Sequence, residues 1–209
     1  MIRIHKALEP EWFHDWKKQE TPDWSPSYDN LRHSEKEGLK DSLIEEQGYL
    51  CCYCGRAIYA GNSHIEHFKP QSKYPELGLA YNNIHASCES VTSCGHKKAD
   101  RFDENKCISP LEVEEGRFVF TLVGEVHPKV SDDEASKYMI ELLNLNDRPL
   151  VVKRKKILNA VFSAQSIEKF SSDELQKLRR MYQERDENNG YQEFRQALTS
   201  YIDNGLTSS

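Results

Sequence analysis

The sequence lacks a long apolar run, an apolar leader and an excess of basic residues, and each absence excludes a class of protein. No stretch of its 209 residues approaches the 18 or more apolar residues that a membrane-spanning helix needs, so we expect no membrane contact. The first residues, MIRIHKALEPEW, lack the apolar core of a secretory signal peptide. We therefore expect a cytoplasmic protein.

The charge balance is acidic, with 28 Lys and Arg against 34 Asp and Glu and a formal net charge of -6. A free-standing nucleic-acid binder usually has a strongly basic surface, so this balance counts mildly against one. A local basic cleft or a basic partner subunit could still supply the attraction to phosphate. The length suits one domain with appended elements, or two small domains.

Six cysteines are present, and in the cytoplasm they stay reduced. Cys51 and Cys54 form a C-x-x-C pair, and Cys88 and Cys94 form a second pair with the wider spacing C-x5-C. Two such pairs predict a structural zinc site, because four thiolates bind zinc tetrahedrally and leave no position for water. The alternative interpretation is that these are four unrelated buried cysteines.

The two remaining cysteines have simpler interpretations. Cys107 reads as a small buried hydrophobic residue. Cys52 could replace Cys51 as a zinc ligand, but only Cys51 keeps two residues between itself and Cys54.

Helical periodicity surrounds the cysteine region. A helix is predicted after Pro10, and another from about residue 31 to 47, ended by Gly48. The second helix has an apolar stripe of Leu39, Leu43 and Ile44.

A short hairpin is predicted in RFVFTLVGEV, with Phe118, Phe120 and Leu122 on one face. Helices follow it, and Ser131-x-x-Glu134 and Ser171-x-x-Glu174 each fit a capping box. The run Lys153-Arg154-Lys155-Lys156 lies in one of them and is expected to be solvated, since four consecutive residues point all round a helix.

These patterns predict an α+β, mainly helical fold in three segments. Residues 1–48 form an N-terminal helical segment, and residues 49–110 form a small module held together by zinc. Residues 111–209 form the hairpin and a C-terminal helical region, which we expect to dock to a partner.

Chemistry is suggested by Glu66 and His67, which lie side by side between the two cysteine pairs. Hydrolysis of a phosphodiester needs a base for water and a cation that stabilises the charge on phosphate and leaving oxygen. Neutral imidazole suits the base near pH 7, and a carboxylate suits a hard ion such as Mg²⁺.

At this point residues 50–101 resemble the HNH endonuclease family. The resemblance consists of Cys51-x-x-Cys54, Glu66-His67 followed by Pro70, Asn83-Ile84 five residues before Cys88, and Cys94-Gly95-His96-Lys97-Lys98. It implies a ββα-metal module, in which a two-stranded hairpin and a helix hold one divalent ion.

The resemblance also implies roles for individual residues. His67 would be the general base, and Glu66 and His96 would hold a catalytic ion, Mg²⁺ or Mn²⁺. Asn83 would brace the active-site loop. The family more often has Asp before the base, and here one extra residue separates Cys94 from His96.

Over most of its length the sequence resembles the HNH subunits of Septu-type and retron-linked anti-phage systems, the PtuB-like proteins. The order MIRI, CCYCGR, HIEHFKPQS, SCGHKKAD and LNLNDRPL carries this resemblance. It implies a bacterial defence nuclease that acts on DNA or RNA with a PtuA-like ATPase, and in some systems with a retron reverse transcriptase and its RNA–DNA product.

Other polar residues near the motifs have both a functional and a structural interpretation. His64 shares a strand face with Glu66, so it is either an extra ligand or supporting residue, or a structural histidine. For His85 we favour the structural role over a supporting one. Lys97, Lys98 and Arg101 follow the metal site on the expected helix of the module, and we predict that they contact phosphates.

Two rival functions remain. A zinc-stabilised adaptor that binds an ATPase or nucleic acid without cutting would need the four cysteines but none of Glu66, His67 and His96. A hydrolase that uses zinc for catalysis would need an open position on that ion, which four cysteine ligands do not leave. For the nuclease, phage DNA and host RNA such as tRNA both remain candidate substrates.

Overall fold

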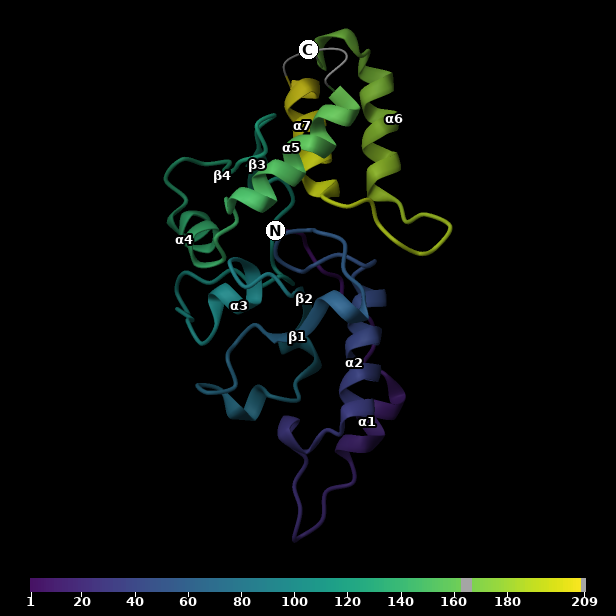
Figure 1. The fold of residues 1–209 in the computed structure, drawn as a ribbon, viewed down its shortest axis with the longest axis vertical. Helices are drawn as coiled ribbons and strands as arrows, with labels where there is room; N and C mark the ends of the chain where they lie inside the picture. Colours follow the sequence, from purple (N-terminus) through teal and green to yellow (C-terminus); the bar gives the residue numbers. More distant parts are fainter. Residues whose placement is uncertain (163–166, 208–209) are drawn as a thin grey trace.

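The computed structural model describes residues 1–162 and 167–207 and has the predicted α+β class. The molecule is elongated, with helices α1 and α2 and the β1–β2 sheet in one half and helices α5, α6 and α7 in the other (Figure 1). The N-terminus lies near the middle, where Met1, Ile2 and Ile4 are buried. Buried side chains form one continuous cluster that runs from Met1 to Ile202.

The first half begins with α1 (Glu11–Lys17) and α2 (His33–Glu46), as predicted. Pro10 precedes α1, and its fixed φ and missing N–H are tolerated at a helix start. Leu39, Leu43 and Ile44 are the buried residues of α2. Gly48 follows with φ +61, the left-handed conformation that lets the chain leave a helix.

The same half contains a two-stranded antiparallel sheet and a short helix (Figure 1). Strand β1 (Ser63–His67) pairs with β2 (Ile84–Cys88), so that Glu66 lies opposite His85 and His64 opposite Ser87. Helix α3 (Cys94–Lys98) follows β2 and packs beside it. These elements follow one another in the order strand, strand, helix.

The second half contains the predicted hairpin, β3 (Phe118–Phe120) and β4 (Val126–Pro128), with Gly124 at φ +92 in the turn. Phe118 and Phe120 are buried as expected, but Leu122 is 39% exposed. The reason is that β3 ends at Phe120, so Leu122 lies in the turn.

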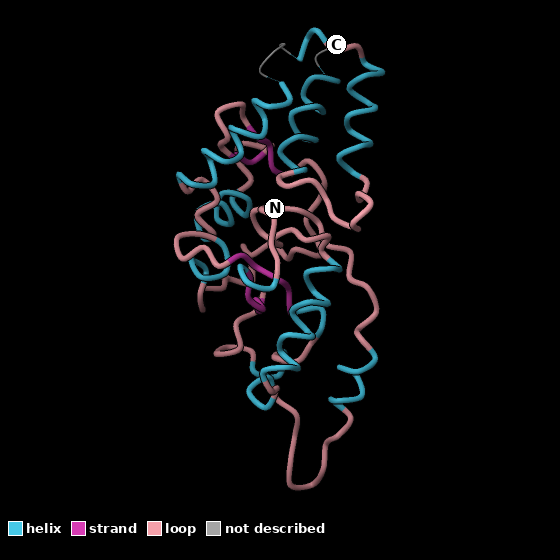
Figure 2. Tube along the Cα trace, turned by 45° about the vertical axis from the view of Figure 1, so that its right-hand side comes forward, coloured by secondary structure: helices cyan, strands magenta, loops and turns pink. Residues whose placement is uncertain are grey.

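Four helices complete the described chain (Figure 2). They are α4 (Glu134–Leu142), α5 (Arg148–Phe162), α6 (Ser172–Gln183) and α7 (Arg195–Thr207). Short 3-10 turns lie at Tyr28–Asn30, Ala60–Asn62, Pro75–Leu77, Tyr81–Asn83 and Ile167–Lys169. No helix within residues 1–162 and 167–207 has the length and apolarity of a membrane span.

The basic run on α5 is only partly solvated. Arg154 is 2% exposed, and its guanidinium donates to the carbonyls of Leu150 and Leu145. Lys153 pairs with Glu193. The expectation of a solvated run is therefore wrong for Arg154, because one of four consecutive helix positions has to face the core.

The two predicted capping boxes have different outcomes. Ser171 Oγ accepts a hydrogen bond from the Glu174 backbone N–H, and the Ser171 backbone N–H donates to the Glu174 carboxylate, as predicted for α6. The box at Ser131 is wrong, because α4 starts later and its N-cap is Asp133. The Asp133 carboxylate accepts from the Ser136 backbone N–H at 3.0 Å and from both arms of the Arg117 guanidinium.

Replacement of the observed cap should therefore cost more than replacement of the predicted one. We expect Asp133→Ala to lower the free energy of unfolding by about 1–2 kcal/mol, since it removes a helix cap and a partly buried ion pair. Ser131→Ala, at an exposed position, is the control and should change it by less than about 0.5 kcal/mol. Urea unfolding of the two variants at pH 7 measures the difference.

The loss of stability caused by Asp133→Ala should also depend on pH. It should be complete near neutral pH and should shrink as the pH falls below about 4. The hydrogen bonds from the Arg117 guanidinium hold the pKa of Asp133 well below its usual value. Stability from such a group is complete above the unfolded carboxyl pKa of about 4 and is lost as the pH falls further. If the difference in unfolding free energy between Asp133→Ala and Ser131→Ala stayed constant down to pH 2, this assignment of the cap would be contradicted.

Candidate metal centre and active site

The four predicted zinc ligands meet in the core of the first half. Cys51 and Cys54 lie in a turn after α2, in which the Gly55 N–H donates to the Cys51 carbonyl at 3.0 Å. Cys88 is the last residue of β2, and Cys94 is the first residue of α3. All four are buried and none forms a disulfide. Segments far apart in the chain thus converge on one point.

The geometry of the cysteines fits a tetrahedral ion. Their four sulfurs lie within 4.8 Å of one another, and Cys54 Sγ lies 3.9 Å from Cys88 Sγ. Around a zinc ion with Zn–S bonds of about 2.3 Å, tetrahedral geometry separates the sulfurs by about 3.8 Å. The predicted set of four is therefore brought together, and it could hold a metal ion such as zinc. Cys52 is buried beside this group but is not part of it.

The protonation states of the clustered cysteines depend on one another, because their thiols lie so close together. Burial acts to raise the pKa of Cys51, but hydrogen bonds from the neighbouring thiols lower it well below its usual value. The hydrogen bond to Cys51 raises the pKa of Cys54 and of Cys94 well above theirs. Four thiolates can coexist at such a site only with a cation among them.

A second group of polar side chains surrounds an open depression of about 430 Å³ beside β1 and α3. Its lining includes His64, Glu66 and His67 from β1, and His96 from α3. The tertiary structure therefore brings the predicted base, the predicted carboxylate and the predicted helix ligand to one place.

Glu66 lies at the back of this depression and is 7% exposed. Its Oε1 accepts from the Lys98 ammonium at 2.8 Å and from the Tyr53 hydroxyl at 3.0 Å, and its Oε2 lies 3.6 Å from His64 Nε2. Burial acts to raise the pKa of Glu66, but hydrogen bonding from His64 and the charge of Lys98 lower it below its usual value. Glu66 is thus a carboxylate at neutral pH.

Lys98 occupies a different position from the one predicted. It is 1% exposed, and besides Glu66 its ammonium contacts the His67 carbonyl at 2.9 Å. A phosphate contact requires an accessible ammonium, so the structure corrects the expected position of Lys98. Lys97 is exposed, and Arg101 turns its guanidinium toward the carbonyls of Lys98 and Leu142.

His67 is held in place by a backbone carbonyl and an aromatic ring. Its Nε2 lies 2.9 Å from the Gly78 carbonyl, and the Tyr28 ring packs edge-on against it at 4.6 Å between centroids. A carbonyl only accepts, so Nε2 carries the proton and Nδ1 keeps its lone pair. Burial lowers the pKa of His67, which favours the neutral imidazole at pH 7.

Asn83 holds the loop that frames the depression. It is 5% exposed, and its side chain accepts from the Lys69 backbone N–H at 2.8 Å. It also donates to the carbonyls of Lys69 and Leu77, each at 3.1 Å. These three hydrogen bonds connect Asn83 to the backbone at Lys69 and Leu77.

His85 is fully buried opposite Glu66 on the sheet, and neither of its ring nitrogens has a hydrogen-bond partner among the described residues. Burial lowers its pKa well below the usual value, so it is neutral.

Sequence reasoning missed Glu89, which lies at the rim of the site. Glu89 Oε2 is 2.6 Å from His96 Nε2, and Glu89 Oε1 is 3.6 Å from His64 Nδ1. The signal was available in the alternation of the strand, because Glu89 is two residues beyond Ser87 and therefore shares its face.

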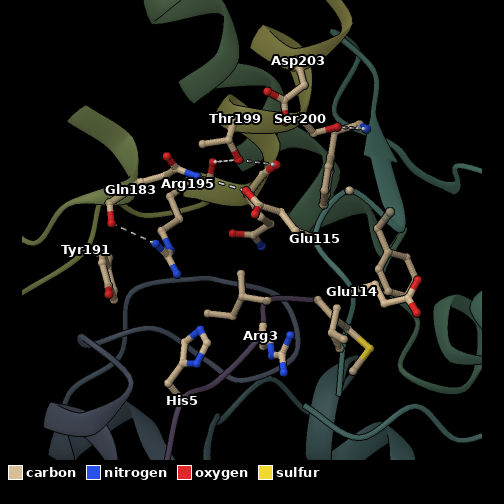
Figure 3. A pocket seen from close by; sticks show the side chains of 17 residues that line it. Arg3, His5, Glu114, Glu115, Gln183, Tyr191, Arg195, Thr199, Ser200 and Asp203 are labelled. Atoms are coloured by element: carbon tan, nitrogen blue, oxygen red, sulfur yellow. Dashed lines mark hydrogen bonds between the residues drawn. The ribbon is translucent and has the colours of Figure 1, made fainter. Parts of the chain in front are cut away.

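A separate cavity of about 380 Å³ lies where the N-terminal segment meets α7. Arg195 and Tyr191 approach it from one side, and Arg3 and His5 from the other (Figure 3). The Arg195 guanidinium stacks on the Tyr191 ring at 3.8 Å. None of the site residues predicted from the sequence lines this cavity.

Gly95, the residue between Cys94 and His96, lies close against the side chains of β1. A Cβ atom at this position would lie 2.5 Å from Glu66 Oε2 and 2.6 Å from His64 Nε2. Only a glycine lets α3 approach the β1 side chains so closely.

Two known proteins are similar to this chain in sequence. No protein-family model matches the chain. The chain is similar to the "Retron Vc95 putative HNH endonuclease" of Vibrio cholerae serotype O1 biovar El Tor, with 30% identity over 58% of this chain and 63% of that protein. It is also similar to the "Retron Ec83 putative HNH endonuclease" of Escherichia coli, with 26% identity over 76% of this chain and 79% of that protein.

The chain spans less than two thirds of the first of these relatives, at 63% of its length. Both names nonetheless support an HNH endonuclease family for this chain.

The four-cysteine set predicts a definite metal content. The purified chain should hold about one zinc ion, and Cys88→Ala should lose it together with cooperative unfolding, because a three-sulfur site binds zinc far more weakly. Cys52→Ala is the matched control, since it removes a buried neighbouring thiol and should retain the ion. Elemental analysis and thermal unfolding measure both. A Cys88→Ala protein with its full zinc content would disprove the ligand set.

The close approach at Gly95 predicts a steric effect. Gly95→Ala should destabilise the protein by about 1–3 kcal/mol, because the Glu66 carboxylate is held by Lys98 and Tyr53 and cannot move aside freely. Gly38→Ala is the control: a Cβ there meets only Trp12, at 3.6 Å, and α2 should gain up to about 1 kcal/mol. Equal stability of the two variants would contradict this interpretation of Gly95.

Proposed function

We propose that this chain is a metal-dependent HNH endonuclease that hydrolyses phosphodiester bonds of nucleic acid. The observation that carries the proposal is the convergence of Glu66, His67 and His96 on one open depression beside a four-cysteine cluster. Their sequence positions alone do not require this convergence. The names of both relatives add support.

In the proposed mechanism, His67 Nδ1 takes the proton from the attacking water. Its Nε2–H bond to the Gly78 carbonyl holds the ring in the tautomer that leaves Nδ1 as the base. Asn83 keeps the surrounding loop in place through its three hydrogen bonds. The segment that positions the imidazole is thereby rigid before the substrate arrives.

The depression would hold a divalent ion, Mg²⁺ or Mn²⁺, with His96 and Glu66 as the ligands that the family resemblance implies. Such an ion supplies positive charge that stabilises the phosphate in the transition state and the departing oxygen. Lys98 keeps Glu66 ionised and fixed in orientation. Lys97, which is exposed beside the site, is proposed to contact the backbone of the substrate.

We further propose that the chain acts in anti-phage defence with a PtuA-like ATPase, and with a retron reverse transcriptase and its RNA–DNA product. The word retron in the names of both relatives supports the second partner. The net charge of -6 fits a subunit that relies on a partner to grip nucleic acid. DNA and RNA are both candidate substrates.

The test is a cleavage assay on wild type and His67→Ala. Plasmid DNA and total RNA are each offered with Mg²⁺ or Mn²⁺, with and without the ATPase. Loss of the base should reduce cleavage at least about 100-fold, while zinc content and thermal stability stay unchanged. His33→Ala, an exposed histidine at the start of α2, is the control and should cleave normally.

The same assay also distinguishes the nuclease from its rival, the zinc-stabilised adaptor. Undiminished cleavage by His67→Ala would remove the proposed base. If the folded, zinc-containing wild type cuts neither DNA nor RNA under all these conditions, the zinc-stabilised adaptor becomes the better explanation.

A further inference from the structure

Three side chains from different elements meet at the outer rim of the depression. His64 comes from β1, Glu89 from the residue after β2, and His96 from α3. Each offers a ligand atom, and the three atoms lie within 4.8 Å of one another. The His64 and His96 rings lie 4.2 Å apart between centroids. Glu66 is not part of this set.

The two nitrogens of His64 face different neighbours. Nε2 lies 3.6 Å from Glu66 Oε2, and Nδ1 lies 3.6 Å from Glu89 Oε1. Nδ1 is buried and has no hydrogen-bond partner among the described residues, so in the tautomer with the proton on Nε2 its lone pair is free to bind a cation. Metal-bound histidines commonly donate the other ring N–H to a carboxylate, which fixes the tautomer. Glu66 is in the position of that carboxylate.

Glu66 is poorly placed to turn outward and bind an ion directly. Its Oε1 already accepts from Lys98 and Tyr53, and its side chain is 9% exposed. Breaking a buried ion pair by removing one partner is strongly unfavourable, because the remaining charge is left without compensation. The carboxylate at the accessible side of His64 is Glu89, whose side chain is 46% exposed.

The four-cysteine cluster fixes the segments that carry Glu89 and His96. Glu89 directly follows Cys88, and His96 lies two residues after Cys94. The Glu89 N–H donates to the Asn62 carbonyl at 2.9 Å, which continues the β1–β2 ladder by one residue. The loop between Glu89 and His96 is thus fixed at both ends by candidate zinc ligands.

We propose that His64, Glu89 and His96 form the ligand set of the divalent ion, with Glu66 behind His64 as the residue that orients it. Two imidazoles and one carboxylate suit a first-row transition ion such as Mn²⁺, whereas Mg²⁺ prefers oxygen ligands only. The site should therefore select Mn²⁺ over Mg²⁺. This set keeps His96 but replaces Glu66, the other ligand that the family resemblance implies, with His64 and Glu89. The inference rests on the proposed function, and ion binding can be measured independently of cleavage.

The test measures Mn²⁺ binding to the full zinc-containing chain, by the loss of the electron paramagnetic resonance signal of free Mn²⁺. Glu89→Gln preserves shape but removes the charge, and should weaken binding at least about tenfold. Glu187→Gln removes one exposed charge far along the chain and should bind as wild type does. Thermal unfolding checks that both variants fold. His96→Gln is a second variant, expected to weaken Mn²⁺ binding similarly.

Ion selection is tested on the wild type by competition. A roughly hundredfold excess of Mg²⁺ should leave most of the Mn²⁺ bound. Wild-type affinity in Glu89→Gln, absence of Mn²⁺ binding by the wild type, or ready displacement by Mg²⁺ would each overturn the proposal.

The binding result is independent of the nuclease result. If Glu89→Gln loses Mn²⁺ but the wild type cuts no nucleic acid, the ligand set stands and the nuclease proposal fails. If Glu89→Gln binds Mn²⁺ normally and His67→Ala alone loses cleavage, the nuclease proposal stands and this ligand set fails.

Discussion

The meeting of four buried cysteines is the constraint on which the site depends. Cys51 and Cys54 follow α2, Cys88 ends β2 and Cys94 begins α3, so one cluster sets where a turn, a strand and a helix lie relative to one another. A sheet of two short strands is marginal by itself, and here it gains a fixed end at Cys88. A structural ion at this point would contribute to folding directly, because the unfolded chain has no preformed site.

The second tie between strand and helix is the buried pair of Glu66 and Lys98. A buried ion pair is weak evidence for stability, since the cost of desolvating two charges offsets much of their attraction. Its effect here is on orientation: the ammonium holds Glu66 Oε1, and this leaves Oε2 facing His64. Gly95 lets α3 lie close to β1, because any side chain at that position would collide with Glu66 and His64. Packing and electrostatics together thus decide which polar atoms face the depression.

The surface near the site is less basic than the sequence suggests. Of the three cations that follow the cysteine cluster, Lys98 is buried, and Arg101 turns its guanidinium toward backbone carbonyls. Arg154 of the basic run is also buried. With a net charge of -6, the chain offers little long-range attraction to phosphate. This is consistent with the proposal that a partner helps to hold the nucleic acid.

The sequence by itself determined the α+β class, the helices around the cysteine region, and the four cysteines that come together. These features depend on local periodicity and on paired spacing, which are written in neighbouring residues. Only the tertiary structure decided that Lys98 is buried, that Asp133 caps α4 in place of Ser131, and that Glu89 joins His64 and His96. A residue type and its spacing do not say which side chain will face the core or a distant carboxylate, because that depends on how strand, loop and helix pack around a shared point.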